Sequence, residues 1–301
     1  MIQNQNIDIE DFCDSYIPIV KSYATEFSNK ISELDKLKFL VYKDFDTKTT
    51  KELIDYANQV SDKCISSFIY RLVGVQEIIF CREKSIELDT KEVWNLLSKS
   101  IRIIHSEPTI SSIGSQGFLS IPLYKKDASL ESFDFIRLHI WDDSLDKYMD
   151  LQKCSDFSIH SHTFFAKSWI ITGKVKNDRY EFETNSNDSK HSFFEVQYNK
   201  SLNEVNKHSS KAVNKKIDAK LFKTSEEIHF SKGFYEIKPS KLHKSGHLNS
   251  PHSSATFFSF TGKEGLGESF VVGPKTILES EINRKMNIPP IYLFDKIDAQ
   301  L

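Results

Sequence analysis

Arginine is scarce in this sequence: the 40 Lys and Arg residues include only six Arg. A guanidinium binds planar anions through two parallel hydrogen bonds, which an ammonium group does not do. Each arginine is therefore a candidate for an anion site. The six are Arg71, Arg82, Arg102, Arg137, Arg179 and Arg284.

Cysteine is also sparse, and no two Cys residues have the C-x-x-C spacing. The four are Cys13, Cys64, Cys81 and Cys154. Their separation excludes zinc ribbons and dithiol redox motifs, and it favours a reducing compartment. The N-terminal segment is polar and acidic, unlike a secretory signal, and no apolar run approaches 18 residues. We therefore expect a cytoplasmic protein that does not span a membrane.

The chain has little net charge, -2 over 301 residues. This balance argues against a nucleic-acid or membrane-surface binder as the role of the whole protein. Hydrophobic residues make up 39% of the chain, with 23 Phe and 11 Tyr in the whole sequence, which argues against disorder. A chain of this length can bury a sizeable core without disulfides or a structural metal.

The first third of the chain has the periodicity of helices. Apolar residues recur at three- and four-residue steps over 12–34, which places them on one helix face. A capping box predicts a second helix over 49–72, and another predicts a third helix over 89–104. We therefore expect a helical domain over residues 1–106.

After Glu107-Pro108 the pattern changes to short segments rich in Phe, Ile, Val and Thr, separated by Gly, Ser, Asn and Asp. The segments typical of strands are 118–124, 133–141, 157–162, 168–176, 193–198, 233–238, 255–262 and 269–272. Many short strands with few helices between them predict an antiparallel β-barrel or sandwich over residues 107–301. The predicted fold class is therefore α+β.

A Lys-rich stretch at about 199–225 interrupts the strand pattern. One interpretation is a solvated surface insert, either a short helix or a loop. The alternative is a basic lid that attracts an anionic ligand.

Two of the ten histidines, His160 and His162, form an H-x-H pair inside a strand-like segment. Residues two apart on a strand point to the same face, so both imidazoles are expected to project together. This spacing suits two metal ligands, although two exposed histidines on a strand would show the same pattern.

The residues that follow resemble the first motif of the cupin superfamily, in which H-x-H precedes a frequent Glu ligand and then a Gly. Gly173 stands at the matching distance, whereas Ala166 stands where many cupins have Glu. The segment GFYEIKPSKLH resembles the second cupin motif and makes His243 the third ligand, with His247 and His252 as alternatives. The resemblance implies a cupin-like double-stranded β-helix.

Three His ligands without a carboxylate resemble the cysteine dioxygenase-like branch of the cupins. The resemblance implies one divalent metal, Fe(II), held by His160, His162 and His243, with Zn, Ni or Mn as alternatives. It also implies a non-haem iron dioxygenase that acts on a small thiol or a related acid.

A carboxylate on such a substrate would pair best with a forked cation. Arg137 is the candidate, because it shares a strand face with His139 and Trp141. The alternative is that Arg137 lies at the rim and pairs with Asp142 or Asp143. His139 is interpreted either as a hydrogen-bond partner near the metal or as a core histidine.

Two other functions fit the same residues. The first is a non-catalytic, ligand-binding or regulatory cupin whose helical domain binds a protein partner or a second copy. The second is a metal-dependent isomerase or lyase of an anionic, sugar-like substrate. All three readings expect a small-molecule partner and neither a membrane nor a nucleic acid.

Overall fold

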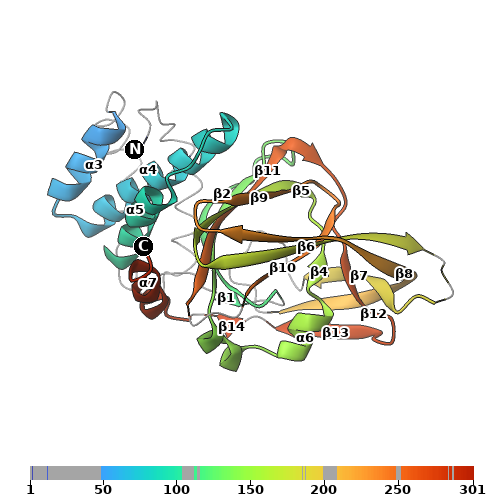
Figure 1. Cartoon of the computed structure of the whole chain (residues 1–301). Coiled ribbons are helices and arrows are strands. Elements are labelled where there is room, and N and C mark those ends of the chain that lie inside the picture. The colour runs from blue at the N-terminus through green and yellow to red at the C-terminus, as the bar shows by residue number, and fades with distance from the viewer. Residues whose placement is uncertain are drawn as a thin grey trace.

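The computed structural model shows two antiparallel β-sheets and a layer of helices against one of them (Figure 1). It describes residues 2, 12, 49–103, 112–113, 116–184, 186, 188–198, 209–248, 252–283, 285–286 and 288–301. The helices are α3 (Thr50–Gln59), α4 (Lys63–Glu83), α5 (Thr90–Ile103), the 3-10 helix η1 (Asp143–Tyr148), α6 (Leu151–Asp156) and α7 (Ile291–Asp298).

The strands are β1 (Ser112–Ile113), β2 (Leu119–Lys126), β3 (Asp134–Trp141), β4 (Ile159–His160), β5 (Phe164–Thr172), β6 (Lys174–Thr184), β7 (His191–Tyr198), β8 (Ser209–Phe230), β9 (Phe234–Ile237), β10 (Leu242–His247), β11 (Ser254–Leu266), β12 (Val271–Pro274), β13 (Glu279–Asn283) and β14 (Lys285–Met286). The described fold is thus mixed and largely β, which agrees with the coarse prediction.

Sheet A has the strand order β14-β1-β2-β3-β11-β5-β9, and sheet B has the order β13-β8-β6-β10-β4-β12-β7. Strand β8 also pairs with β7, so the pairings of sheet B run in a ring through β8, β6, β10, β4, β12 and β7. Strand β8 is irregular near Lys216, whose φ is 57°, where the register with β7 shifts as in a β-bulge.

The helix boundaries correct one prediction. Thr49 and Glu52 form the predicted capping box, since each side chain bonds the other residue's backbone N–H. However, the single helix predicted over 49–72 is wrong, because α3 ends at Gln59 and α4 begins at Lys63. Asp62 caps α4 by accepting from the backbone N–H groups of Cys64 and Ile65. Of the stripe predicted over 12–34, only Phe12 lies within the described residues.

One stretch of helix α4 is long and apolar enough to cross a membrane by length and composition. The apolar stretch is interrupted by Arg71 and Glu77, so the expectation that no apolar run approaches 18 residues still holds. Yet 72% of this apolar stretch is buried inside the folded chain. Helix α4 therefore has the surroundings of a core helix.

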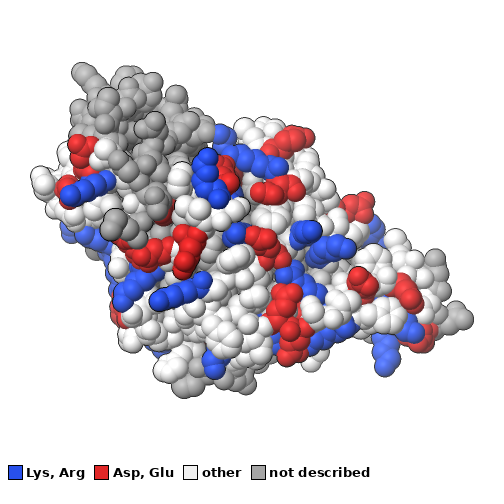
Figure 2. All heavy atoms as spheres, turned by 45° about the horizontal axis from the view of Figure 1, so that its top comes forward, with Lys and Arg blue, Asp and Glu red and all other residues white. Residues whose placement is uncertain are grey.

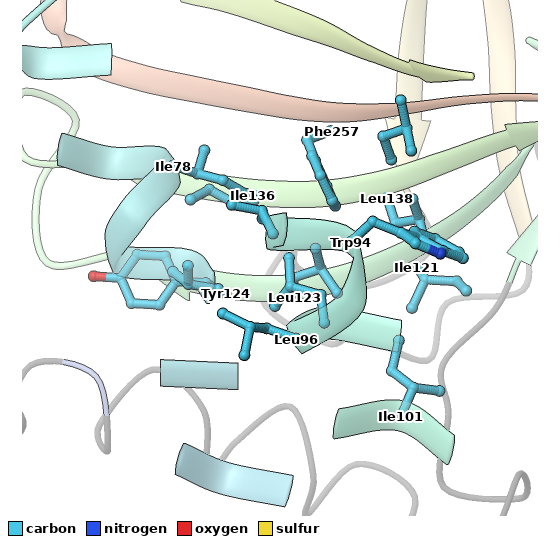
Figure 3. Packing of buried hydrophobic residues seen from close by; sticks show 14 of the residues in the cluster. Ile78, Trp94, Leu96, Ile101, Ile121, Leu123, Tyr124, Ile136, Leu138 and Phe257 are labelled. Atoms are coloured by element: carbon cyan, nitrogen blue, oxygen red, sulfur yellow. The ribbon is translucent and has the colours of Figure 1, made fainter. Parts of the chain in front are cut away.

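Sheet A is buried on both faces, and its residues alternate between two environments. Leu138 and Ile140 of β3 and Phe257 of β11 face the helices, where they pack with Ile78 and Trp94 in the largest core cluster (Figure 3). The residues between them face sheet B, and Trp141 and Phe258 join a second cluster there. This is the period-two pattern of a strand.

A buried ion pair attaches the helical layer to sheet A. The guanidinium of Arg82 in α4 donates to both carboxylate oxygens of Asp134 in β3, and to the hydroxyl of Ser259 in β11. Arg82 is 4% exposed and Asp134 is also 4% exposed. Because this charge pair lies away from water, it depends on both partners.

The C-terminal helix packs with the N-terminal helices. The ring of Trp94 in α5 lies 5.0 Å from that of Phe294 in α7, and its indole N–H donates to Asp298. The helices and one face of sheet A therefore share one core. A domain division at residue 106 stays a prediction.

The Lys-rich stretch is not a helix or loop in its described part, which corrects that expectation. Residues 209–225 belong to β8, which pairs with β6, β7 and β13. Lys211, Lys220 and Lys223 each form an ion pair with an acidic residue, so they do not form a free cationic lid. On the face in Figure 2, basic and acidic side chains are interspersed.

We expect Arg82→Met to lower the free energy of unfolding by about 3–5 kcal/mol, because Asp134 then keeps a buried charge without its cation. Urea denaturation followed by far-UV circular dichroism measures the change. The double variant Arg82→Met/Asp134→Leu is the control, and it should recover most of the loss. Equal losses in the single and double variants would contradict this explanation.

The carboxylate of Asp142 predicts a loss of stability in acid. Burial raises its pKa, but hydrogen bonds from Lys296, Ser144 and Ser253 outweigh burial and hold the pKa at about 2. Its stabilising contribution of about 2 kcal/mol is present above pH 4 and is lost as the pH falls through 2. The variant Asp142→Asn should flatten this part of a stability curve measured between pH 5 and pH 2.

Candidate metal centre

Three histidines from two distant parts of the sequence, His160 and His162 from one and His243 from the other, converge between the two sheets. His160 ends β4, and His243 lies opposite it in the antiparallel register of β10. His162 lies just after β4, which is shorter than the strand predicted over 157–162. A common strand face is therefore not the reason that His160 and His162 meet.

The loop after β4 is fixed by bonds to a neighbouring segment. Ser161 donates from its backbone N–H to the carbonyl of Phe270, and its hydroxyl accepts from the N–H of Phe270. Ser161 is 1% exposed. These bonds hold the segment so that His162 turns back toward His160 and His243.

The three imidazoles are close enough to hold one ion. Their ring centroids are 4.7 Å (His160–His162), 4.4 Å (His160–His243) and 4.8 Å (His162–His243) apart. One ligand nitrogen from each ring lies within 4.8 Å of the other two. Among the described residues, these three histidines are the one cluster of His, Cys, Asp or Glu side chains whose geometry could hold a metal ion.

Burial keeps the three rings neutral. It lowers the pKa of His160, and it lowers those of His162 and His243 further, with the neighbouring His160 adding to the effect. Metal ligation requires the neutral imidazole, because the protonated ring has no lone pair to donate. Burial therefore keeps the three imidazoles in the neutral form that metal binding requires.

The hydrogen bonds of these rings also fit a metal. His160 Nδ1 lies 2.8 Å from the carbonyl oxygen of Ser158, which only accepts, so the proton is on Nδ1 and Nε2 carries the lone pair. His162 Nε2 and His243 Nδ1 are buried and have no hydrogen-bond partner. Buried nitrogens without partners are uncommon in proteins, and an ion between the rings would satisfy them.

The alternative third ligands lie elsewhere. His247 Nε2 lies 3.4 Å from Asp143, and His252 is exposed. Ala166 is buried in the apolar cluster between the sheets. The donor set that the structure brings together is thus three imidazoles.

Gly173, which the resemblance to the cupin motif singled out, makes the turn between β5 and β6. Its φ of +79° is in the left-handed region, and a Cβ there would approach the carbonyl oxygen of Ser253 to 2.8 Å. A larger residue would therefore clash with the backbone at the start of β11.

Aromatic side chains of sheet A border the centre. The ring of Phe260 lies 4.8 Å from His162, and that of Phe258 lies 4.9 Å from His139. His139 is 4% exposed, stacks also on Phe118, and has a strongly lowered pKa because of burial. It is thus a neutral, buried histidine beside the centre.

Arg137 lies on the same face of β3 as His139, as the alternation predicts. It is half-buried, and its guanidinium lies 4.4 Å from the ring centroid of Phe135. Its charge contributes to the lowered pKa of both His139 and His162. Of the two proposed rim partners, Asp142 accepts hydrogen bonds from Lys296, Ser144 and Ser253, and Asp143 lies 3.4 Å from His247 Nε2.

A second arginine near the centre was missed by the sequence interpretation. Arg179 lies opposite His243 in the register of β6 and β10, so their side chains share a face. Its guanidinium binds Glu227 at 3.0 Å and donates to the carbonyl of Glu236 at 2.6 Å. The scarcity of arginine was the available signal, but only the register places Arg179 beside His243.

No protein-family model matches the chain, and no curated protein matches it in sequence. A solved structure titled "Crystal Structure of FeII HppE" aligns with 70% of this chain and 96% of that chain, at 9% identity and a TM-score of 0.28. A TM-score this low is below the level that indicates a shared fold. The candidate metal centre therefore stands on its own geometry.

We expect the purified protein to bind about one divalent metal per chain after incubation with Fe(II) without oxygen. His160→Ala, His162→Ala and His243→Ala should each lose most of the metal that elemental analysis detects. His252→Ala is the matched control and should keep it, because that residue is exposed. Equal metal content in all four variants would refute the site.

Proposed function

We propose that this protein is a metal-dependent, cupin-like enzyme that binds one Fe(II) ion through His160, His162 and His243 and oxygenates a small thiol. The observation that carries the proposal is the convergence of three neutral imidazoles, two of which have a buried nitrogen without a hydrogen-bond partner. The absence of a carboxylate from this group favours the three-His class of non-haem iron site.

Bound ferrous iron would supply open coordination positions for a thiolate and for O₂. The overall reaction balances as RSH + O₂ → RSO₂H, so both oxygen atoms enter the product and no other reductant is needed. Binding both reactants at one ion makes their encounter intramolecular.

The residues of the chain hold the ligands and exclude water. The carbonyl of Ser158 fixes the orientation of His160, and the Glu227–Arg179 pair forms part of the wall beside His243. Phe258 and Phe260 cover the side of His162. A dry, low-dielectric surrounding strengthens the attraction between the centre and an anionic thiolate.

Arg137 is the proposed binding residue for a carboxylate on the substrate. Two observations support this role: Arg137 lies on the inner face of β3, and its charge contributes to the lowered pKa of His162. A guanidinium can bind both oxygens of a carboxylate at once, which would orient the thiol relative to the centre.

We expect Fe(II)-loaded protein to consume O₂ when a small thiol that carries a carboxylate is added, and to form a sulfinate that is 32 Da heavier than the thiol. An oxygen electrode and mass spectrometry measure both quantities. Arg137→Met should raise KM about tenfold or more for carboxylate thiols. Arg102→Met, on the helical layer, is the matched control and should leave KM unchanged.

The outcomes of this experiment separate the alternative functions. Bound iron without O₂ uptake for any thiol would overturn the dioxygenase and favour a ligand-binding cupin or an isomerase of an anionic substrate. An unchanged KM in Arg137→Met would overturn the role of that residue alone.

A further inference from the structure

The inner face of sheet A carries a row of polar side chains that sequence patterns did not reveal. Ser120 of β2 lies opposite His139 of β3, and His139 lies opposite Thr256 of β11. Their neighbours Leu119 and Phe257 belong to the core on the other face. The three side chains thus form one line across three strands. We call Ser120, His139 and Thr256, together with Trp141 on the same face, the polar row.

Each member of the polar row is buried and lacks a hydrogen-bond partner. The exposed fractions are 5% for Ser120, 4% for His139, 2% for Trp141 and 0% for Thr256. The atoms without partners are Ser120 Oγ, His139 Nε2, Trp141 Nε1 and Thr256 Oγ1. A buried polar atom without a partner destabilises a protein, so four on one face call for a ligand or an ordered water that satisfies them.

The polar row borders the metal centre. Its member His139 stacks on Phe258, which contacts His162. His139 also has an electrostatic effect on the pKa of His162, and His160 has one on the pKa of His139. A molecule that bound at the three-His group would therefore meet this wall.

The donor chemistry of the polar row defines the group that it would bind. Trp141 Nε1 only donates, both hydroxyls can donate, and the neutral ring of His139 can carry its proton on Nε2. No acidic side chain belongs to the row. All four atoms can therefore donate to oxygen atoms that only accept, such as those of a carbonyl or a carboxylate.

We propose that the polar row is a substrate subsite that binds a carbonyl-type oxygen, from a carboxylate or an amide, on the molecule that reacts at the metal centre. This inference rests on the proposed function for the identity of the site. It adds Ser120, Trp141 and Thr256 to Arg137 as residues that determine specificity. The row differs from Arg137 because its contacts do not require a charged ligand.

The first test measures stability and uses no ligand. In metal-free protein, Thr256→Val removes a hydroxyl that has no partner, so the melting temperature should rise by about 2–4 °C. Ser120→Ala should also raise the melting temperature. A fall in both variants would mean that these hydroxyls make structural bonds, and it would overturn the inference.

The second test measures binding to protein loaded with Co(II), which avoids oxidation of the thiol. The probes are mercaptoacetate, 2-mercaptoacetamide and ethanethiol. Their binding is measured from the thiolate-to-cobalt absorption band. Wild-type protein should bind both carbonyl probes about tenfold or more tighter than ethanethiol. Thr256→Val should reduce that ratio by about fivefold, and Thr256→Ser, which keeps the hydroxyl, should restore it.

The two proposals fail in different ways. A ratio unchanged by Thr256→Val and by Ser120→Ala overturns the polar row, whatever the O₂ uptake. A ratio that falls as expected in a protein that takes up no O₂ supports the subsite and overturns the dioxygenase. Equal binding of mercaptoacetate and 2-mercaptoacetamide assigns the contact to the neutral row, and a preference for mercaptoacetate that Arg137→Met removes assigns the charge to Arg137.

Discussion

The burial of both faces of sheet A is the constraint on which the rest of the structure depends. Along β3 and β11, alternate residues either pack against the helices or face the three-His group. A slip of one residue in register would exchange these two sets and place Arg137 and His139 in the helical core. The ion pair of Arg82 with Asp134 opposes such a slip. Arg82 of α4 bonds both Asp134 of β3 and Ser259 of β11, so it joins the helix to both strands. The helical layer thus stabilises the register that the site requires.

The two sheets contribute different parts of the centre. The strands of sheet B bring His160 and His243 opposite one another, and sheet A supplies the aromatic rings, Arg137 and the polar row. Burial acts on both sides, since it keeps the imidazoles neutral and leaves the donors of the polar row without a hydrogen-bond partner in the protein. Neutral imidazoles and unsatisfied donors weaken the protein without ligands, and they are the groups that an ion and a substrate would satisfy. The groups that would bind an ion and a substrate therefore lower the stability of the protein when nothing is bound.

Much of the outline could be predicted from local patterns. The alternation in FDFIRLHIW separates the two faces of β3, and the H-x-H spacing marks two members of the three-His group. Where prediction failed, one pattern in the sequence obscured another. The apolar stripe over 49–72 continues across the break between α3 and α4, where Asp62 starts a new helix. In β8, charged residues on both sides of the strand hide the period-two pattern, because the ion pairs of Lys220 and Lys223 replace an apolar face.

The sequence by itself determined the class of the fold, the histidines that are candidates for metal binding, and the lack of a carboxylate ligand at the position of Ala166. The tertiary structure decided which histidine completes the group, because the register of β10 with β4 brings His243 to His160 while His247 reaches Asp143. It also decided that Ser120, His139 and Thr256 form one row. Such cross-strand neighbours are set by pairing between segments far apart in the chain, and no local spacing records that pairing.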